Sequence, residues 1–529
     1  MEYFYIPLVL IGCYLILRTK NALHVLQQNS YNLDGRYFKW ILTNRIKIYT
    51  LFDHLTLLLA LLFIFINDKN IILISTSVLY FVITIFSFLK MKKETYKLKF
   101  KVTSRIKRLI FTIFLIYTIP TLLIVLNFDI NHLHDYFYGY ILIGYLQYYV
   151  VLLALFINSP IERLVYYYYY FKAKKKLKGM KSLDVIGITG SYGKTSSKNI
   201  LSDILNIKYN VLPSPKNFNT PYGLMITVNN YLDKFTDLLI AEMGAYRKGE
   251  IKELCDFVQP KYGILTKIGV AHLESFGSQE NIQYGKFELI ESLPQDGIGI
   301  LNRDDELQVK YQLKNKVKII WIGIENKADY TAENIKITKD GSTFDVFVKA
   351  ENKSYKFQTK LLGKTNIYNL LAGIALGHQL GINFEQLQQV VKLVKPVEHR
   401  LELKKYGTIN IIDDAYNSNP LGAKTALEVL KMMKGKKIIV TAGMIELGEQ
   451  QNKLNKQLGK DIAEVCDEVI LIGKNQTKPI YDGLVDSKFS KLKIHVLSDI
   501  KEAFPLVRKL DEGNTYLLIE NDLPDIFNE

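Results

Sequence analysis

The first third of the chain consists of long apolar stretches that are separated by short polar segments. Each apolar stretch is close to the roughly 20 residues that a helix needs to cross about 30 Å of hydrocarbon. The pattern therefore predicts an N-terminal α-helical membrane domain, residues 1–175, with about five transmembrane helices. The predicted spans are Tyr3–Leu17, Leu51–Ile66, Ile71–Leu89, Leu109–Phe128 and Tyr138–Ile157.

Lysine and arginine are shared unevenly among the loops between these stretches. The loop after the first stretch carries Arg36, Lys39 and Arg45, and the loop after the third carries a dense basic run from Lys90 to Arg108. The other loops carry almost none. Because loops rich in Lys and Arg stay on the cytoplasmic side, we expect the N-terminus outside and everything after the fifth span in the cytoplasm. This predicts a multi-pass protein of the cell (plasma) membrane.

Composition and charge exclude several classes of function for this protein. The net charge is +16, and much of the excess lies in those loops, where anionic headgroups attract it. No nucleic-acid-binding module is recognisable, so the predicted partner is the lipid bilayer and not nucleic acid. Charged residues stand only near the edges of the predicted spans, which argues against a transporter. The three cysteines are far apart and fit neither a disulfide scaffold nor a zinc site.

A tyrosine and lysine run, Ile161–Ser182, follows the last predicted span. Tyrosines suit the headgroup level and lysines the anionic surface, so we expect a helix that leaves the membrane there. Beyond it, short apolar runs alternate with helix-like segments, which is typical of α/β domains with parallel sheets. The predicted strands include Asp184–Gly190, Asp237–Ala245, Tyr262–Ser278 as a strand with a polar tail, Thr408–Tyr416, Lys436–Met444 and Thr515–Asp522.

The stretch VIGITGSYGKTSSKNIL, Val185–Leu201, has the form of a phosphate-binding loop. A glycine-rich turn lies between a predicted strand and a predicted helix, and its N–H groups together with the helix N-terminus suit a phosphate. We expect Lys194 to meet the β/γ-phosphates, and Thr195 or Ser196 to bind Mg²⁺. Ile188 stands where the strict G-x-x-x-x-G-K-[ST] spacing requires glycine, so a plain glycine turn is the alternative.

Two further polar residues follow predicted strands. Glu242 ends the apolar run DLLIAE, and His272 follows the run that begins at Tyr262. The carboxyl ends of parallel strands meet at one edge of a sheet, where ligands bind. We therefore expect Glu242 and His272 near Lys194, where a carboxylate and an imidazole beside a triphosphate would suit a divalent metal. Each residue alone would more often be an ordinary surface or core side chain.

From about residue 185 onward the chain resembles the Mur ligases, ATP-dependent amide-forming enzymes of cell-wall peptide assembly, and within them the branch that adds D-alanyl-D-alanine. The resemblance rests on motifs in sequence order. They are TGSYGKTS (Thr189–Ser196), NFNTPYG (Asn217–Gly223), EMGA (Glu242–Ala245) with KGEI (Lys248–Ile251), GVAHLESFGS (Gly269–Ser278), YGKFELIESL (Tyr284–Leu293), GKTNIYNLLAGIA (Gly363–Ala375), EHRLE (Glu398–Glu402), DDAYNSNP (Asp413–Pro420) and AGMIELG (Ala442–Gly448).

The resemblance implies a multi-domain fold and a reaction. An α/β P-loop central ATP-binding domain would occupy residues 176–395 and an α/β Rossmann-like C-terminal domain residues 396–529, with Pro396 in the hinge linker. The family's UDP-sugar-binding domain is absent, and the predicted membrane domain stands in its place. In the implied reaction ATP phosphorylates a carboxylate, an amine attacks the acyl phosphate, and phosphate leaves.

The resemblance also implies roles for the phosphate loop and the metal site. Lys194 and Thr195 would hold phosphate and Mg²⁺, and Glu242 and His272 would surround the metal ions. Lys286 falls where the family often carries a carbamylated lysine; an unmodified lysine paired with an acid is the alternative. The implied catalytic residues are Lys194, His272 and Lys286. The ATP and metal ligands implied in this part of the chain are Gly190, Ser191, Gly193, Lys194, Thr195, Ser196, Glu242, His272 and Lys286.

Other implied site residues come from later segments. Asn366 and Asn369 resemble asparagines on the adenine side, and Arg400 resembles a linker arginine that reaches ATP. Asp414 would contact the nucleotide as the domains close, with the neighbouring Asp413 as the alternative. The residues implied near the acyl substrate are Asn217, Asn219 and Thr220.

The sequence thus predicts a membrane-anchored, ATP- and Mg²⁺-dependent ligase of cell-envelope and peptidoglycan-precursor synthesis. Its acyl substrate would be a carboxylate-bearing envelope precursor, whether UDP-linked, lipid-linked or polymeric, and its amine an amino acid or dipeptide. The chain carries TYLLIENDLPDIFNE where the family has a different C-terminal motif, which leaves both substrates open. Ligases of the poly-γ-glutamate or folylpolyglutamate type, an ATP-driven export component and a non-catalytic scaffold remain alternatives.

Overall fold

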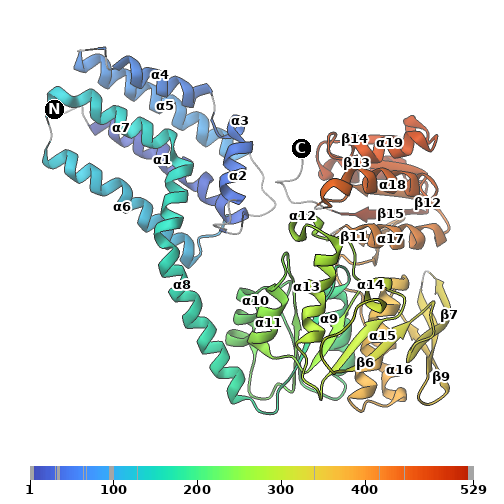
Figure 1. Ribbon diagram of the computed structural model, residues 1–529. Coiled ribbons are helices and arrows are strands. Elements are labelled where there is room, and N and C mark those ends of the chain that lie inside the picture. Colours follow the sequence, from blue (N-terminus) through green and yellow to red (C-terminus); the bar gives the residue numbers. More distant parts are fainter. Residues whose placement is uncertain are drawn as a thin grey trace. The chain divides into compact units, whose positions relative to one another are not determined.

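The computed structural model of the chain describes residues 5–29, 31, 36–49, 51–63, 65–66, 68–93, 100–127, 129–338, 340–415, 418–445 and 447–521. The chain divides into two compact units, Met1–Tyr168 and Tyr169–Glu529 (Figure 1). The described residues of the first unit form helices, whereas the second unit holds two β-sheets with helices around them.

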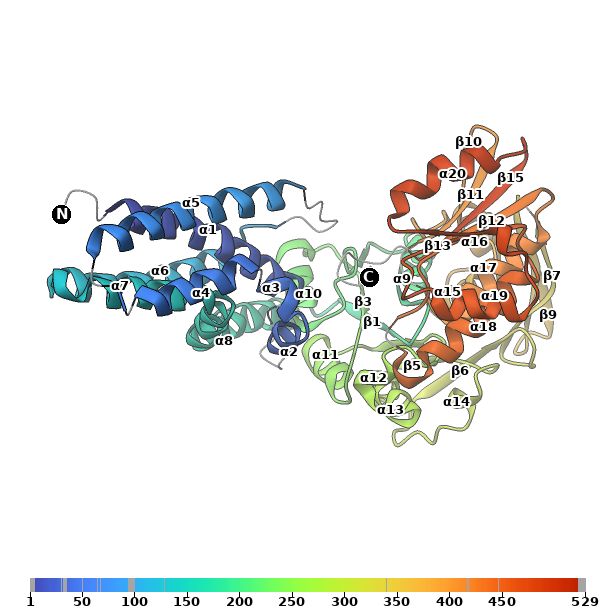
Figure 2. The ribbon, with the colours of Figure 1, turned by 90° about the horizontal axis from the view of Figure 1, so that it is seen from above.

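The helices of the first unit lie along one another in an elongated bundle (Figure 2). Helix α1 packs against α5, and α4 packs against α7. The last helix, α8, begins in this unit and continues into the second. The helices are α1 (Tyr5–Gln28), α2 (Arg36–Thr43), α3 (Arg45–Ile48), α4 (Leu51–Phe63), α5 (Lys69–Lys93), α6 (Ser104–Leu126), α7 (Leu133–Tyr145) and α8 (Gln147–Gly179).

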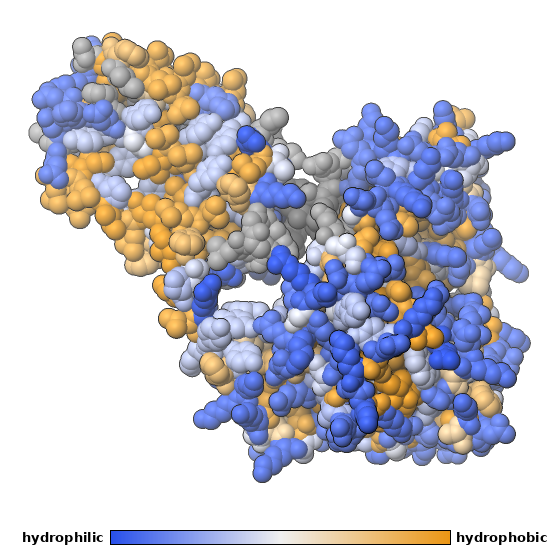
Figure 3. Space-filling model, viewed as in Figure 1, coloured by the Kyte–Doolittle hydropathy of each residue, from blue (hydrophilic) through white to orange (hydrophobic). Residues whose placement is uncertain are grey.

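Four helices among the described residues are long and apolar enough to cross a membrane: α1, residues Lys69–Leu89 of α5, α6 and α8. Many of their apolar side chains are exposed, and apolar residues gather on the surface of this unit (Figure 3). The structure differs from the prediction of five spans in two places. Helix α4 has 13 residues, a length of about 20 Å, and the predicted span Tyr138–Ile157 is divided between α7 and α8 at Leu146. Apolar composition does not fix where a helix begins and ends.

A buried ion pair lies within the helical unit. The guanidinium of Arg18 lies 2.6 Å from a carboxylate oxygen of Asp53. The hydroxyl of Tyr14 donates to the same oxygen and accepts from Arg18 at 2.8 Å. The expectation that charged residues stand only near the span edges was therefore wrong. Helix α1 continues past the predicted end at Leu17 to Gln28, which places Arg18 inside the helix.

The first sheet of the second unit has nine strands in the order β2-β3-β1-β4-β5-β6-β7-β8-β9. Strands β2 to β7 pair in parallel, while β7, β8 and β9 form an antiparallel edge. The strands are β1 (Asp184–Thr189), β2 (Val211–Pro213), β3 (Leu238–Glu242), β4 (Tyr262–Leu265), β5 (Ile298–Asn302), β6 (Lys318–Gly323), β7 (Tyr330–Thr338), β8 (Gly341–Val348) and β9 (Lys353–Thr359). The helices are α9 (Lys194–Leu205), α10 (Pro221–Ile226), α11 (Glu250–Val258), α12 (Leu273–Phe276), α13 (Gln279–Glu291), α14 (Glu306–Val309), α15 (Lys364–Gln379) and α16 (Phe384–Leu393).

Helices cover both faces of this sheet. Alternate residues of a strand point to opposite faces, so each strand packs its side chains against helices on both sides. Ile186 and Ile188 of β1 join a core with α9, α15 and α16. On the other face α13 approaches β1 so closely that a Cβ at Gly187 would lie 2.5 Å from a methyl group of Leu289. Strands β3, β1 and β4 are neighbours and parallel, so their carboxyl ends share one edge.

The second sheet has six strands in the order β10-β11-β15-β12-β13-β14. Only the β10–β11 pair is antiparallel among its pairs; the others are parallel, as expected for an α/β domain. The strands are β10 (Glu402–Tyr406), β11 (Ile409–Asp414), β12 (Lys436–Thr441), β13 (Glu468–Ile472), β14 (Ile494–Leu497) and β15 (Thr515–Glu520). The helices are α17 (Pro420–Met432), α18 (Gln451–Ala463), α19 (Lys478–Asp486) and α20 (Ala503–Leu510).

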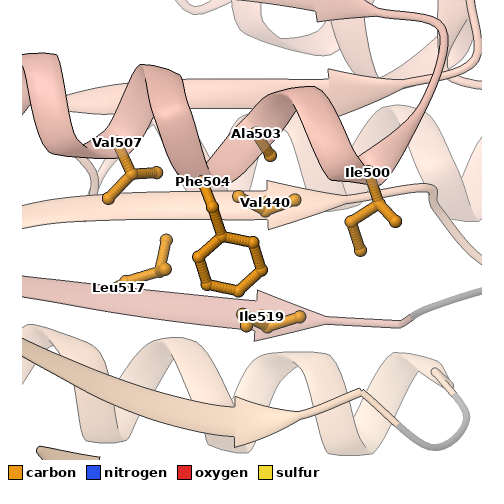
Figure 4. A pocket seen from close by; sticks show the side chains of 7 residues that line it. All are labelled: Val440, Ile500, Ala503, Phe504, Val507, Leu517 and Ile519. Atoms are coloured by element: carbon orange, nitrogen blue, oxygen red, sulfur yellow. The ribbon is translucent and has the colours of Figure 1, made fainter. Parts of the chain in front are cut away.

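A small pocket lies where α20 packs on β12 and β15 (Figure 4). Its lining side chains are all apolar, so it offers no group that would bind a phosphate or a charged substrate. The pocket belongs to the packing of the second sheet. Its lining residues are Val440, Ile500, Ala503, Phe504, Val507, Leu517 and Ile519.

Candidate active site

The loop between β1 and α9 is shaped by two glycines. Gly190 has φ +147° and Gly193 has φ +81°, backbone conformations that side-chain-bearing residues rarely adopt. A Cβ at Gly190 would lie 1.9 Å from the hydroxyl of Thr266 on the neighbouring β4 side. Ser191 fastens the loop because its hydroxyl donates to Gly269 O at 3.1 Å and accepts from Gly269 N at 2.9 Å. The loop is therefore a preformed turn in front of the N-terminus of α9, where partial positive charge favours an anion.

Lys194 folds back over this loop. Its ammonium group donates to the carbonyl oxygen of Gly190 at 2.8 Å and to that of Ser191 at 3.4 Å. Burial lowers the pKa of Lys194, the charge of Glu242 opposes that shift, and the charge of Arg400 adds to it. A buried ammonium held by two neutral carbonyl oxygens lacks a full counter-charge, so a phosphate would stabilise it.

Glu242 ends β3 beside the loop and is almost completely buried, at 1% exposure. One carboxylate oxygen, Oε1, accepts from the Thr195 hydroxyl at 3.1 Å and from the Asn219 amide at 3.2 Å. The other, Oε2, lies 3.0 Å from the ammonium nitrogen of Lys198. The structure therefore brings Thr195 and Glu242 together as the sequence predicted, with Asn219 added.

The residues that follow Glu242 contact the other expected metal-site residues. The ammonium of Lys286 lies 3.5 Å from the carbonyl oxygen of Ala245, and the ring of Tyr246 lies 4.4 Å from that of His272. Lys286 is buried, and burial together with the charge of Lys194 lowers its pKa well below the usual range. A lowered pKa increases the share of the neutral, nucleophilic amine, which is the form that carbamylation requires.

The residues at this edge fit a nucleotide phosphate and a divalent cation. The Asn369 amide nitrogen is buried without a hydrogen-bond partner among the described residues. The side chain lies beside Gly193, where an added Cβ would lie 3.4 Å from Asn369 Oδ1 and 3.8 Å from the amide nitrogen. Hydroxyl and carboxylate oxygens such as those of Thr195 and Glu242 are the ligands that Mg²⁺ prefers, together with phosphate oxygens. Within the described ranges no group of three or more His, Cys, Asp and Glu side chains forms a ready cage. Phosphate oxygens and water would complete the coordination of a cation here.

The two adenine-side asparagines differ in their surroundings. The amide of Asn366 donates to the carbonyl of Leu362 at 2.9 Å, inside its own helix start. The side chain of Asn369 is the one that lies beside Gly193 of the phosphate loop. In this arrangement Asn369 is placed to contact a ligand directly, and Asn366 is engaged in holding α15.

The β10–β11 hairpin separates the two neighbouring aspartates. Asp413 accepts from His399 at 2.8 Å and from Lys404 at 2.7 Å. Burial by itself raises the pKa of Asp413, but these two hydrogen bonds outweigh it and hold the pKa below its usual value. Asp414 is more deeply enclosed, and burial raises its pKa to about 6 although the charge of Arg400 opposes the shift. Asp413 is thus engaged in hydrogen bonds within the hairpin. The charge of Arg400 acts on the pKa of both Asp414 and Lys194.

The predicted substrate loop is tied to β3 and α10. Asn219 accepts a hydrogen bond from Gly244 N at its carbonyl, 2.8 Å, in addition to the bond from its amide to Glu242. The Thr220 hydroxyl caps α10 by accepting from Gly223 N at 3.2 Å. Asn217 is exposed. The loop therefore presents Asn217 outward and uses its neighbours for anchoring.

Two buried charged residues near these groups were missed from the sequence. Lys198 contacts Glu242. Lys198 lies four residues after Lys194, so both lie on one face of the helix, and this spacing could have indicated that Lys198 is near the site. Glu520 ends β15 beside β11, next to Asp414 in the register. A carboxylate at the end of a predicted parallel strand was the available signal there.

Two protein-family models match the chain. Residues 188–377 match the family model of the Mur ligase middle domain, and residues 399–519 match the Mur ligase glutamate ligase domain. The chain belongs to the Mur ligase family.

Within that family the chain is similar to proteins named UDP-N-acetylmuramoyl-tripeptide--D-alanyl-D-alanine ligase. It is 33% identical to the Bacillus subtilis protein over 295 residues, which are 55% of this chain and 63% of that protein. It is 31% identical to the Escherichia coli protein over 294 residues, 55% of this chain and 64% of that protein. The chain thus spans just under two thirds of the length of these curated relatives.

Solved structures of MurF ligases have the same fold over much of the chain. The Acinetobacter baumannii MurF structure superposes with a TM-score of 0.60 at 25% identity, over 66% of this chain and 76% of that one. The Thermotoga maritima MurF structure in complex with ADP superposes with a TM-score of 0.59 at 27% identity, over 67% of this chain and 80% of that one.

Proposed function

We propose that this protein is an ATP-dependent ligase that joins a carboxylate of a cell-envelope precursor to an amine. The observation that carries the proposal is the meeting of Thr195, at the start of α9, with Glu242, at the end of β3, beside the folded-back Lys194. This is the arrangement that a magnesium nucleotide needs. Membership of the Mur ligase family and the similarity to a MurF structure with ADP support ATP as the nucleotide.

In the proposed reaction the chain's own residues position the phosphates and hold charge. Lys194 turns from the Gly190 carbonyl to the phosphate oxygens, and the loop N–H groups and α9 hold them in place. Thr195, Glu242 and His272, together with Lys286 if its amine is carbamylated and so carries carboxylate oxygens, would hold Mg²⁺, which neutralises charge on the transferring phosphoryl group.

The second sheet would supply the remaining charge. Arg400 lies close enough to both Lys194 and Asp414 for its charge to affect the pKa of each. An arginine in that position can stabilise negative charge as a carboxylate becomes an acyl phosphate. Asp414 would then orient Arg400 or the nucleotide, and Asn369 would donate to the bound nucleotide.

For the substrates we propose a muramoyl-peptide-type carboxylate and D-alanyl-D-alanine, after the names of the relatives. A second candidate is a lipid-linked or polymeric carboxylate. It is favoured by the four helices long and apolar enough for a membrane that the same chain carries. Anchoring the ligase domains at the inner membrane face would raise their concentration near such a substrate. We propose three domains, which are a membrane domain at residues 1–175, a central ATP-binding domain at 176–395 and a C-terminal Rossmann-like domain at 396–529.

One assay tests these proposals together. The full chain, purified in detergent, is given ATP and Mg²⁺ with UDP-linked or lipid-linked muramoyl peptide, each with and without D-alanyl-D-alanine. Phosphate release that needs both the carboxylate and the amine supports the ligase. The carboxylate that is used decides between the two candidates. Failure to bind ATP, or ATP turnover that ignores every carboxylate and amine, would overturn the proposal.

A further inference from the structure

Lys198 is a buried lysine that the proposed reaction leaves without a role. It lies on α9, one helical turn after Lys194, and is 1% exposed. Its ammonium group makes two contacts, which come from two different segments. It lies 3.0 Å from Glu242 Oε2, and it donates a hydrogen bond to the carbonyl oxygen of Lys216.

The first contact gives the two oxygens of the Glu242 carboxylate different neighbours. Oε2 faces the Lys198 ammonium, whereas Oε1 faces the Thr195 hydroxyl and the Asn219 amide. The side chains of Lys198 and Glu242 are each 2% exposed, so water cannot replace either partner. A buried carboxylate without a counter-charge is strongly unfavourable. Lys198 supplies that counter-charge when nothing else is bound.

The second contact reaches the segment that precedes the proposed acyl-substrate loop. Lys216 has φ +50°, a strained conformation for a residue with a side chain, and its carbonyl is turned toward Lys198. The same segment is fastened at Ser214, whose N–H donates to Ile240 O and whose hydroxyl accepts from Glu242 N. The end of β3 and the ammonium of Lys198 together therefore hold this turn.

We infer that Lys198 is a positioning residue that couples the metal carboxylate to the acyl-substrate loop. Its ammonium fixes Glu242 Oε2 and the Lys216 carbonyl, which leaves Oε1 for the metal beside Thr195. The inference rests on the proposed function, since it assigns Glu242 to the metal. The inference adds to the proposed function that Lys198 and the cation share the Glu242 carboxylate, each as a counter-charge to it.

A thermodynamic consequence follows from this sharing. Without ligand, removing the Lys198 charge leaves a buried carboxylate unpaired; with Mg²⁺ bound, the cation still neutralises it. The substitution therefore costs the metal-free protein more stability than the metal-bound protein. By linkage the variant must gain more from Mg²⁺ than the wild type gains.

The test uses the full chain in detergent, with Mg²⁺ and ADP as the probes. The Mg²⁺ concentration that gives half of the ADP-dependent rise in the thermal midpoint is measured for wild type, Lys198→Met, Lys198→Gln and Lys198→Arg. Lys252→Met, which removes an exposed lysine paired with Asp256, is the matched control. Hydrogen exchange of residues 214–220 is followed in the same samples.

We expect Lys198→Met and Lys198→Gln to lower the half-saturating Mg²⁺ concentration by about tenfold or more. They should also speed exchange in residues 214–220, while Lys198→Arg and Lys252→Met stay close to wild type. Lys198→Gln serves if Lys198→Met does not fold. An unchanged or higher Mg²⁺ requirement in a folded neutral variant would overturn the inference.

Glu242→Gln separates this failure from a failure of the proposed function. If Glu242→Gln leaves the Mg²⁺ requirement of ADP binding unchanged, Glu242 holds no metal, and the metal assignment of the proposed function is wrong. If Glu242→Gln raises that requirement while Lys198→Gln leaves it unchanged, the metal assignment stands and only the coupling role of Lys198 is lost.

Discussion

The ammonium nitrogen of Lys194 lies 2.8 Å from the carbonyl oxygen of Gly190, four residues earlier in the same loop. The loop therefore holds its own lysine through a backbone carbonyl. Burial and the nearby charge of Arg400 lower the pKa of Lys194, against the opposing charge of Glu242. An incoming phosphate replaces a neutral acceptor with a charged one, and hydrogen bonds to charged partners are about twice as strong.

Lys194→Ala should abolish ATP turnover, with a loss of about 10²–10³-fold or more, because it removes a charge that acts where negative charge develops. The measurement is phosphate release by the full chain with ATP and Mg²⁺. Lys208→Ala, which removes a lysine bonded to Leu380 O, should keep wild-type turnover. Both variants should fractionate in the same way as the wild type. Undiminished turnover in Lys194→Ala would show that the loop is not the ATP site.

Asn369→Leu should weaken ADP binding without destabilising the ligand-free protein. The amide nitrogen of Asn369 is buried and unpartnered among the described residues, so an apolar isostere removes an unfavourable group. Its bond to a charged ligand is worth about 1.5–3 kcal/mol, roughly 10–100-fold in affinity. Calorimetric titration with Mg²⁺ and ADP measures the loss, and thermal unfolding measures stability.

Asn455→Leu gives the contrasting control for that experiment. The buried Asn455 amide donates to Met444 O at 2.9 Å and accepts from Met444 N at 2.8 Å, so its removal should lower the thermal midpoint and leave ADP affinity unchanged. Wild-type ADP affinity in Asn369→Leu would place the nucleotide elsewhere than beside Gly193.

The sequence predicted most of the second unit because its signals are local. The apolar runs at Asp184–Gly190 and Thr515–Asp522 became β1 and β15, and both lie in parallel sheets. A strand buried on both faces needs a continuous apolar run, which a short window of sequence reveals. The same locality made the strand-to-helix loop around Lys194 recognisable.

Features that depend on distant residues were not predictable in this way. Helix α1 continues through Arg18 because Asp53, 35 residues later, neutralises the guanidinium, and a window of apolar residues cannot show that partner. The choice between Asp413 and Asp414 needed the register of β10 on β11, which pairs Glu402 with Asp413. The roles proposed for His272, Lys286 and Arg400 remain predictions, and the structure adds only their neighbours.

The Arg18–Asp53 pair should stabilise the helical unit only as a pair. Arg18→Leu or Asp53→Leu leaves a buried charge without its partner and should cost about 3–5 kcal/mol. The double substitution should cost clearly less than the sum of the two, because no charge is left in the apolar interior. Thermal or denaturant unfolding in detergent micelles measures the three variants. Additive losses would show that Arg18 and Asp53 do not interact in the folded protein.

Glu520 should make the second unit less stable as the pH rises from about 6 to about 8. Burial is the main cause that raises the pKa of Glu520 to about 8, with the charge of Asp414 adding to it and the Ser418 and Thr441 hydroxyls opposing it. In the unfolded chain this carboxyl titrates near its ordinary value of about 4.3. Between these values the folded state binds a proton that the unfolded state lacks. The contribution of Glu520 to stability is therefore complete below the unfolded pKa and is lost as the pH rises through the folded pKa.

Glu520→Gln keeps the shape and the neutral charge, and it should remove this dependence, which amounts to at most about 1.4 kcal/mol per pH unit. The thermal midpoint of the full chain is measured at pH 6, 7 and 8. The wild-type midpoint should fall relative to that of Glu520→Gln, and the exposed Glu449→Gln should follow the wild type. Asp414, whose pKa is raised to about 6, titrates mainly below this range and is present in all the variants. Parallel midpoints for wild type and Glu520→Gln would mean that Glu520 is already ionised in the folded protein, with the Ser418 and Thr441 hydroxyls sufficient to hold its charge.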